Sequence, residues 1–294
     1  MCGRDMTMPG DGLVWSDGKS LLGPELTAAV LNGTVPQFRL DDMVLRIVAA
    51  WYQLGQDDPL FPKSPTFSSW FRDRMGPKYF GASNDNTMIL ANNHTDPRGG
   101  PEEHAKLARE IAAEGIVMLK NTNLTLPLSG GYGSQPRKTP FREIAIFGSD
   151  AGHSPLGPNG CADRGCNIGT LAQGWGSGSV EYPYLISPLE AIQARAIQDG
   201  STVSFVLEDG ATQRVNDTAS QAGKWGVDEA VCLVFVSSDS GENYIHNEGH
   251  DGARKDLELW HKGDEMILAV AERCENTVVV VHTVGPVLVE VNHP

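Results

Sequence analysis

The strongest constraint on the fold is a series of short apolar runs in the second half of the chain. The runs lie at residues 116–119, 144–147, 203–207, 231–236 and 278–281. An apolar run of this length, bounded by polar and turn residues, is typical of a strand that is buried on both faces. We therefore expect an α/β fold with a mostly parallel sheet sandwiched by helices.

Helical patterns occupy the intervals between these runs. We expect one helix at residues 102–114 and another at 255–273, where apolar residues recur at helical spacing. A third helix should begin after Ser187, because Pro188 suits the first helical position and Glu190 completes a capping box with Ser187. Strands and helices that alternate in this way predict parallel strands joined by crossover helices.

The first part of the chain has a different pattern. Residues 39–54 place apolar side chains on one helical face, and Gly55 suits the left-handed cap position. Prolines recur between residues 56 and 100 without sustained periodicity, which is typical of a connection between domains. We expect a first part at 1–55, an interdomain linker at 56–100 and an α/β sandwich domain at 101–294.

The charge balance limits the classes of partner. The chain has 23 Lys and Arg against 37 Asp and Glu, giving a formal net charge of −14. This sign opposes binding to nucleic acid and to anionic membranes. No window approaches 18 consecutive apolar residues, and the chain contains no recognisable signal peptide.

Sequons and cysteines point to a secretory history. The Asn-X-Ser/Thr sequons are at Asn32, Asn93, Asn123 and Asn216. Cys161 and Cys166 lie close together in a Gly-rich loop, which predicts a small disulfide if the protein meets an oxidising compartment. Cys232 lies inside an apolar run and is interpreted as a small core residue, whereas Cys274 gives no signal by itself.

Ligands of an open α/β sheet bind beyond the carboxyl ends of its strands, which directs attention to two loops. The first, after residues 144–147, has neither the dinucleotide fingerprint nor a phosphate-binding loop. The second follows residues 231–236 and is rich in carboxyl and imidazole groups. Its carboxyl and imidazole residues are Asp239, Glu242, His246, Glu248, His250 and Asp251.

This second loop permits more than one interpretation. His246 and His250 could bind zinc from a helix, but Asn247 and Gly249 disfavour a helix here. A carboxylic acid at the end of a buried strand can act as a general acid when partial burial raises its pKa. The alternative is a solvated acidic loop without chemistry.

Several motifs of the chain resemble glycoside hydrolase family 3, in particular its secreted fungal-type β-glucosidases. Asp-Met-Thr-Met-Pro-Gly-Asp at 5–11 resembles the end of that family's barrel domain, although Arg4 stands where leucine is usual. Asn-Gly-Cys-Ala-Asp-Arg-Gly-Cys at 159–166 and Gly-Trp-Gly-Ser-Gly at 174–178 are similar to the first loop of its sandwich domain. Further similar stretches lie at 31–36, 39–44, 150–152 and 284–289.

The resemblance implies a catalytic residue. The family supplies its general acid/base from a Ser-Gly-Glu-Gly motif, which Ser240, Gly241 and Glu242 match. Asn243 replaces the final glycine, and Ala253 stands where the family usually has aspartate. Glu242 is therefore the expected acid/base. Glu248, in the same loop, is the alternative.

The resemblance also implies retaining hydrolysis of terminal non-reducing β-D-glucosyl residues, as in cellobiose and β-glucan breakdown, without a cofactor or metal. The family's nucleophilic aspartate lies in a Ser-Asp-Trp motif upstream of the segment at 5–11. Ser16 and Asp17 are followed by Gly18 and come after that segment, so we do not assign Asp17 as the nucleophile.

The chain therefore resembles the middle of a larger secreted enzyme, which starts here with a C-terminal remnant of a (β/α)8-type barrel. We expect it to supply the acid/base half of a site for a β-glucoside or cello-oligosaccharide, and to be nearly inactive alone. The alternatives are an inactive sugar- or partner-binding module that uses the Trp175 loop, or a fragment without an independent role. A fragment should expose barrel residues such as Ile47 and Trp51.

Overall fold

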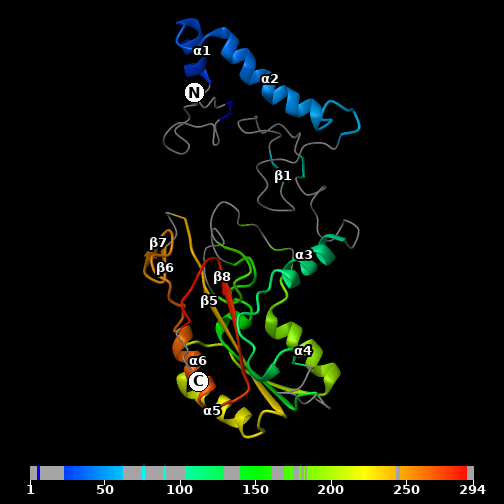
Figure 1. The fold of residues 1–294 in the computed structure, drawn as a ribbon, viewed down its shortest axis with the longest axis vertical. Coiled ribbons are helices and arrows are strands. Elements are labelled where there is room, and N and C mark those ends of the chain that lie inside the picture. The colour runs from blue at the N-terminus through cyan, green and yellow to red at the C-terminus, as the bar shows by residue number, and fades with distance from the viewer. Residues whose placement is uncertain are drawn as a thin grey trace. The chain divides into compact units, whose positions relative to one another are not determined.

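The computed structural model describes part of the chain in detail. The described residues are 5–6, 23–61, 75–76, 89–90, 103–128, 140–160, 168–174, 179, 182, 184–242 and 246–289. The chain divides into two compact units, residues 1–64 and residues 65–294. Figure 1 shows the elements of both.

The first unit contains two helices. α1 spans Pro24–Leu31 and was not expected from the sequence, although Pro24 occupies an initial position that suits it. α2 spans Gln37–Gln53, which confirms the helix expected at 39–54. Gly55 follows with a φ of 69°, the left-handed conformation predicted for it.

One face of α2 is apolar and exposed within this unit. Met43 is the buried residue of the helix, whereas Ile47 and Trp51 remain 41% and 38% exposed. Arg39, on the polar side, forms ion pairs with Asp5 and Asp42. The expected exposure of Ile47 and Trp51 is confirmed.

The second unit is built on a four-stranded parallel sheet. Its strands, in spatial order, are β4 (Thr202–Val206), β3 (Glu143–Phe147), β5 (Ala230–Ser238) and β8 (Thr277–Thr283). Every neighbouring pair is parallel. Four of the five predicted strands and the α/β class are thereby confirmed.

Helices cover both faces of this sheet. α5 (Thr212–Gly223) and α6 (Gly263–Ala271) pack on one face, and α4 (Pro188–Asp199) packs on the other. Figure 1 shows α5 and α6 on the opposite side of the strands from α4. β5 is buried along its whole length, and its residues alternate between the two cores. It is one of the two inner strands of the sheet.

The start of α4 follows the predicted capping box. The Glu190 backbone N–H donates to Ser187 Oγ at 3.3 Å, and the Ser187 N–H donates back to Glu190 Oε2 at 3.0 Å. These bonds satisfy groups that a helix terminus leaves unpaired, so the first turn is fixed locally. The hydrogen bonds from Ser187 and from His153 keep the pKa of Glu190 below its ordinary value.

Two predicted elements differ from the structure. Residues 116–119 are not a strand: they follow α3 (Glu103–Glu114) as irregular backbone, with side chains 64–90% exposed. An apolar run becomes a strand only with a pairing partner, and no strand in the described ranges pairs with this one. The helix expected at 255–273 begins only at Gly263, because His261 and Lys262 both adopt left-handed backbone conformations.

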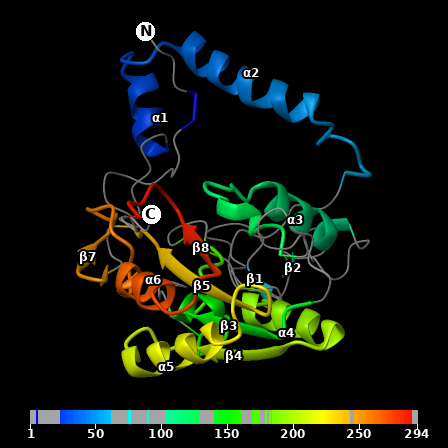
Figure 2. The ribbon, with the colours of Figure 1, turned by 60° about the horizontal axis from the view of Figure 1, so that its bottom comes forward.

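Short elements complete the described structure. β1 (Met75–Gly76) pairs with β2 (Ile89–Leu90), and β6 (His246–Asn247) pairs with β7 (His250–Asp251), both antiparallel. Figure 2 shows the arrowhead of β5 pointing toward the β6–β7 hairpin. Single turns of 3-10 helix lie at Thr122–Leu124 and Ser149–Ala151. Of the helices in the described ranges, none is both long and apolar enough to cross a lipid bilayer.

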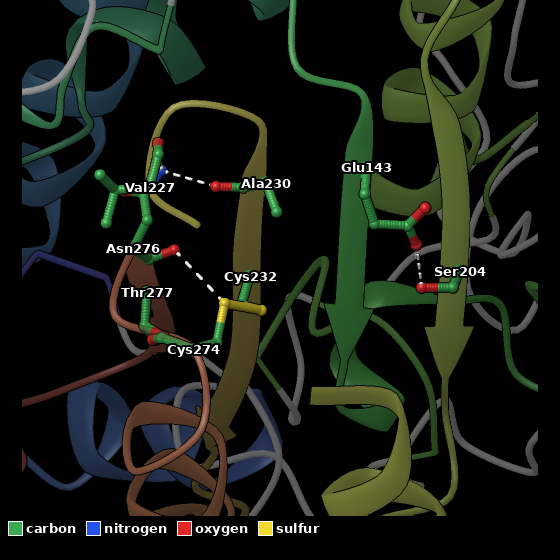
Figure 3. Close-up of a disulfide and its surroundings, with 8 residues drawn as sticks. All are labelled: Glu143, Ser204, Val227, Ala230, Cys232, Cys274, Asn276 and Thr277. Atoms are coloured by element: carbon green, nitrogen blue, oxygen red, sulfur yellow. Dashed lines mark hydrogen bonds between the residues drawn. A yellow bond between two sulfur atoms is a disulfide. The ribbon is translucent and has the colours of Figure 1, made fainter. Parts of the chain in front are cut away.

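A disulfide joins β5 to the segment before β8. Cys232 is buried as expected, but it is bonded to Cys274, so its interpretation as a simple core residue is wrong. Beside it, Asn276 Nδ2 donates to the Ala230 carbonyl at 2.9 Å and to the Val227 carbonyl at 3.3 Å (Figure 3). The disulfide expected between Cys161 and Cys166 lies outside the described residues.

Candidate active site

The candidate site lies at the carboxyl edge of the sheet. From β3 the chain continues to β4 on one side, whereas β5 lies on the other side of β3. The loop after β3 leads to α4 on one face of the sheet, whereas the loop after β5 leads to α6 on the other face, so these two loops diverge. Such a reversal of strand order is where open α/β sheets place their ligands.

Asp239 is the first residue after β5, and its side chain is buried. It is only 1% exposed, and its Oδ1 accepts a hydrogen bond from the Ser240 backbone N–H at 2.7 Å. Its Oδ2 is also buried and has no hydrogen-bond partner in the described part of the chain. Burial raises the pKa of Asp239 to about 7, although the Ser240 N–H and the charge of Arg254 oppose this shift. Burial prevails because it removes the carboxylate from water.

The loop that follows Asp239 is closed at its base. The Gly241 N–H donates to the Gly252 carbonyl at 3.3 Å, and the Arg254 N–H donates to Ser240 Oγ at 3.0 Å. The Arg254 Nη2 donates to the Pro286 carbonyl, beyond β8, at 3.0 Å. Glu242 comes directly after this base, so the closure fixes the backbone from which its side chain projects.

Glu242 and Glu248 have different surroundings. Glu242 is exposed and lies in the irregular segment that follows β5. Glu248 has a left-handed φ of 49°, and its Oε1 lies 3.5 Å from His261 Nδ1. His261 Nδ1 also lies 3.8 Å from Asp209 Oδ2, in the loop after β4. Glu248 thus lies near a histidine of the segment before α6, whereas Glu242 directly follows the closed base of the loop.

His246 and His250 each face a carboxylate of their own. His246 Nδ1 lies 2.6 Å from Asp251 Oδ1, and this hydrogen bond keeps the pKa of Asp251 below its ordinary value. His250 Nε2 lies 3.2 Å from Asp256 Oδ2. Within the described ranges, no three side chains of the kinds that bind metals gather at one point. The zinc interpretation of this histidine pair gains no support.

A second buried acid lies at the end of β3. Asp150 is 1% exposed; its Oδ2 lies 2.7 Å from His282 Nδ1, and its Oδ1 accepts from the Leu171 N–H at 2.7 Å. The hydrogen bond to Asp150 raises the pKa of His282. Asp150 thus ties the segment at 168–174 to β8.

Tyr182 approaches the site from the same long loop. Burial and the negative charge of Asp239 raise the pKa of Tyr182 to about 12, so it stays protonated near neutral pH. Its backbone N–H donates to Asn159 Oδ1 at 2.7 Å, and the Asn159 Nδ2 donates back to the Tyr182 carbonyl at 2.8 Å. Asn159 is the first residue of the motif at 159–166, and this residue has a structural role in placing Tyr182.

The sequence did not single out Asp239, Tyr182 and Arg254 together. Asp239 is a member of the acidic loop, and its place three residues after the apolar run at 231–236 is the signal that it lies at the end of a buried strand. Tyr182 gave no local signal. Trp175 and Asn243 lie outside the described residues, and Ala253 is exposed.

A small cavity lies between the loops after β3 and β5. Its lining includes Ser149, Asp209, Ser237, His261 and Gly263, and it has room for about one water molecule. A cavity of this size cannot hold a sugar ring or an organic cofactor. This cavity is therefore not the substrate site.

Comparisons with known proteins agree on one family. The family profile described as "Glycosyl hydrolase family 3 C-terminal domain" matches residues 116–294. "Probable beta-glucosidase E" of Neosartorya fischeri is 50% identical over 298 residues, which cover 98% of this chain and 27% of that protein. "Beta-glucosidase 1" of Aspergillus aculeatus is 44% identical over 307 residues, covering 100% of this chain and 32% of that protein.

Solved structures show the same similarity. A family 3 β-glucosidase from Neurospora crassa matches with a TM-score of 0.78 and 44% identity, over 97% of this chain and 31% of that one. A β-glucosidase from Chaetomium thermophilum matches with a TM-score of 0.79 and 44% identity, over 99% and 32%. The chain thus spans about a third or less of the length of the proteins it matches.

Proposed function

This chain belongs to glycosyl hydrolase family 3, and on that premise we propose that it forms part of a retaining β-glucosidase. The chain would supply the general acid/base of the site, and Glu242 would be that residue. The observation that carries this proposal is the place of Glu242, which is exposed on a closed loop at the carboxyl end of the buried inner strand β5.

We assign the role to Glu242 and not to Glu248 because Glu242 lies in the Ser-Gly-Glu segment, directly after the closed base of the loop. A general acid/base must reach the glycosidic oxygen, and both glutamates are exposed. The loop closure through Gly241 supplies the fixed backbone that proton transfer at a defined point requires.

The proposed reaction needs a second carboxylate from elsewhere. Retaining hydrolysis uses a nucleophile about 5–5.5 Å from the acid/base and passes through a covalent glycosyl-enzyme. We assign residues 1–55 to the end of a barrel domain, 56–100 to a linker and 101–294 to the sandwich domain, so that the nucleophile would lie on the barrel. The substrate would be a terminal β-D-glucoside such as a cello-oligosaccharide, hydrolysed during cellulose or β-glucan breakdown.

The same proposal includes secretion and glycosylation. The buried Cys232–Cys274 disulfide supports an oxidising compartment. Asn32 and Asn123 are exposed and could carry glycans, whereas the Asn216 side-chain oxygen is buried in α5. Asn216 is therefore the sequon least suited to glycosylation.

The test places residues 1–294 in the Neurospora crassa β-glucosidase, in exchange for the segment that they match. We expect this graft to hydrolyse aryl β-glucosides and the isolated chain to be nearly inactive. Glu242→Gln should lower kcat/KM for substrates with poor leaving groups by about 100- to 10,000-fold. It should affect a dinitrophenyl glucoside less, because that leaving group departs without protonation.

Glu248→Gln is the matched control, because it makes the same change in the same loop. If Glu248→Gln removes activity and Glu242→Gln does not, the assignment of Glu242 is wrong. Clear turnover by the isolated chain that Glu242→Gln abolishes would refute the two-part site. Calorimetry with glucose and cellobiose separates the alternative, since binding by the chain while the graft is inactive would indicate a sugar-binding module.

A further inference from the structure

We propose that Arg254 is a positioning residue, which locks the loop between β5 and α6 so that Glu242 holds a fixed place. This inference rests on the proposed role of Glu242. It adds a residue that does not touch the substrate but determines how accurately the acid/base is aimed.

The backbone of Arg254 closes the loop. Its N–H donates to Ser240 Oγ at 3.0 Å, although 14 residues separate the two in the sequence. The neighbouring Gly241–Gly252 hydrogen bond, at 3.3 Å, closes the loop one residue further out. Both bonds meet the chain within two residues of Glu242, on its N-terminal side. Any opening of this base would therefore move Glu242.

The side chain of Arg254 ties the loop to a second segment. Its Nη2 donates at 3.0 Å to the carbonyl of Pro286, in the segment that follows β8. It packs against the same segment at Gly285, where a side chain's Cβ would lie 3.5 Å from Nη2. That segment is itself held to the sheet, because the Val284 N–H donates to the Ser238 carbonyl at 3.4 Å. The guanidinium thus anchors the loop to the carboxyl end of β8.

The charge of Arg254 has a specific counterpart. Its Nε and Nη1 are buried and make no hydrogen bond within the described ranges, so the guanidinium depends on a nearby negative charge. Its charge acts on Asp239, whose carboxyl group is buried at the start of the same loop. When Asp239 is ionised, the two ends of the loop carry opposite charges, which favour the closed form.

This arrangement matters because proton transfer is sensitive to distance. A catalytic group has to be held within about 0.5 Å of its productive position by a supporting shell. Arg254 has the geometry for this task, because its planar guanidinium can hydrogen-bond Pro286 while it presents charge toward Asp239. Lysine offers a single point charge and cannot reproduce both contacts.

The first experiment measures loop opening in the 294-residue chain by amide hydrogen exchange. Arg254→Met should raise the exchange rate of the Gly241 amide by about tenfold or more, and Arg254→Lys should raise it less. Ser240→Ala removes only the acceptor of the Arg254 N–H and should act in the same direction. If Arg254→Met does not fold, the Ser240→Ala variant still tests whether the loop is closed at its base. Arg142→Met, which changes an arginine stacked on Trp225 away from this loop, is the control and should leave the Gly241 rate unchanged.

The second experiment uses the graft in the Neurospora crassa enzyme. Arg254→Met should lower kcat for poor leaving groups by about tenfold or more, change kcat for a dinitrophenyl glucoside little, and leave KM nearly constant. Arg254→Lys should restore part of this loss. Equal losses for both leaving groups, or unchanged exchange at Gly241, would overturn the positioning role. If the graft itself is inactive, the proposed function fails, while the exchange experiment still decides whether Arg254 locks the loop.

Discussion

The two ends of β5 are held in different ways. At the amino end, the Cys232–Cys274 disulfide and the Asn276 hydrogen bonds join β5 to the segment before β8 without any charge. At the carboxyl end, the strand leads into a buried carboxyl group, Asp239, and a buried part of the Arg254 guanidinium. One strand therefore has a covalently stabilised end and an end that contains buried charge.

The difference between the two ends of β5 shows where this fold contains features that lower its stability. Buried polar atoms without partners and left-handed non-glycine residues both cost stability, and such features gather at functional sites. Asp239 Oδ2, His261 and Lys262 are examples at the carboxyl end, and the buried Asn276 Oδ1, which has no hydrogen-bond partner in the described ranges, is an example at the amino end. The cross-linked amino end can offset that cost, because it constrains the chain without needing solvent or charge.

The largest expected effect is at the amino end. The double substitution Cys232→Ala and Cys274→Ala removes a cross-link between residues separated by 42 positions. Losing a cross-link that closes a loop of this size should lower the free energy of unfolding by about 4 kcal/mol. Guanidinium denaturation under oxidising conditions measures this loss. A loss below about 1 kcal/mol would break the comparison, because the amino end would then not be the stabilised one.

The next effect concerns the pH dependence at the carboxyl end. Burial raises the pKa of Asp239 from 3.8 to about 7, so the folded state holds this proton more tightly than the unfolded state. The resulting stability is complete below pH 3.8 and is lost as the pH rises through about 7. Asp239→Asn should remove this slope, which we expect to be about 1–2 kcal/mol after allowance for solvent screening.

The measurement compares the unfolding free energies of wild type and Asp239→Asn at pH 4.5 and pH 7.5. Asparagine keeps an oxygen that can accept from the Ser240 N–H, so the variant isolates the charge. A variant whose pH slope equals that of wild type would show that Asp239 does not titrate in this interval. The charge of Asp239 would then not destabilise the carboxyl end of β5.

His282 should show a smaller dependence of the same sign. Its hydrogen bond to Asp150 raises its pKa above 6.5, so the charged pair adds stability below pH 6.5 that is lost as the pH rises through the folded pKa. His282→Gln should lower stability by about 1 kcal/mol at pH 5.5 and less at pH 8.5. Equal losses at the two pH values, in thermal unfolding, would mean that the imidazolium charge contributes nothing.

The smallest effect returns to the amino side of the sheet. Arg142 lies just before β3, with its guanidinium 3.8 Å from the centre of the Trp225 ring and its Nη1 3.9 Å from Glu229 Oε2. Because both contacts are largely exposed, Arg142→Met should cost about 0.5 kcal/mol in chemical denaturation. A loss similar to that of the disulfide variant would show that surface charge also stabilises this end.

Local patterns in the sequence determined much of the fold. The capping box at Ser187, the left-handed Gly55 and the apolar runs of four strands all formed as predicted. These features depend on residues within a few positions of one another, so their interactions can be recognised without knowing the fold. The same local matching identified the loop that carries Glu242.

Only the tertiary structure decided the rest, because the deciding contacts join residues that are distant in the sequence. The run at 116–119 has the apolarity of a strand but pairs with none in the described ranges. Cys232 forms a disulfide with a cysteine 42 residues away, and Arg254 donates a hydrogen bond to Pro286, 32 residues away. A pairing edge, a disulfide partner and a buried charge each depend on which segments the fold brings together, and no local pattern contains that information.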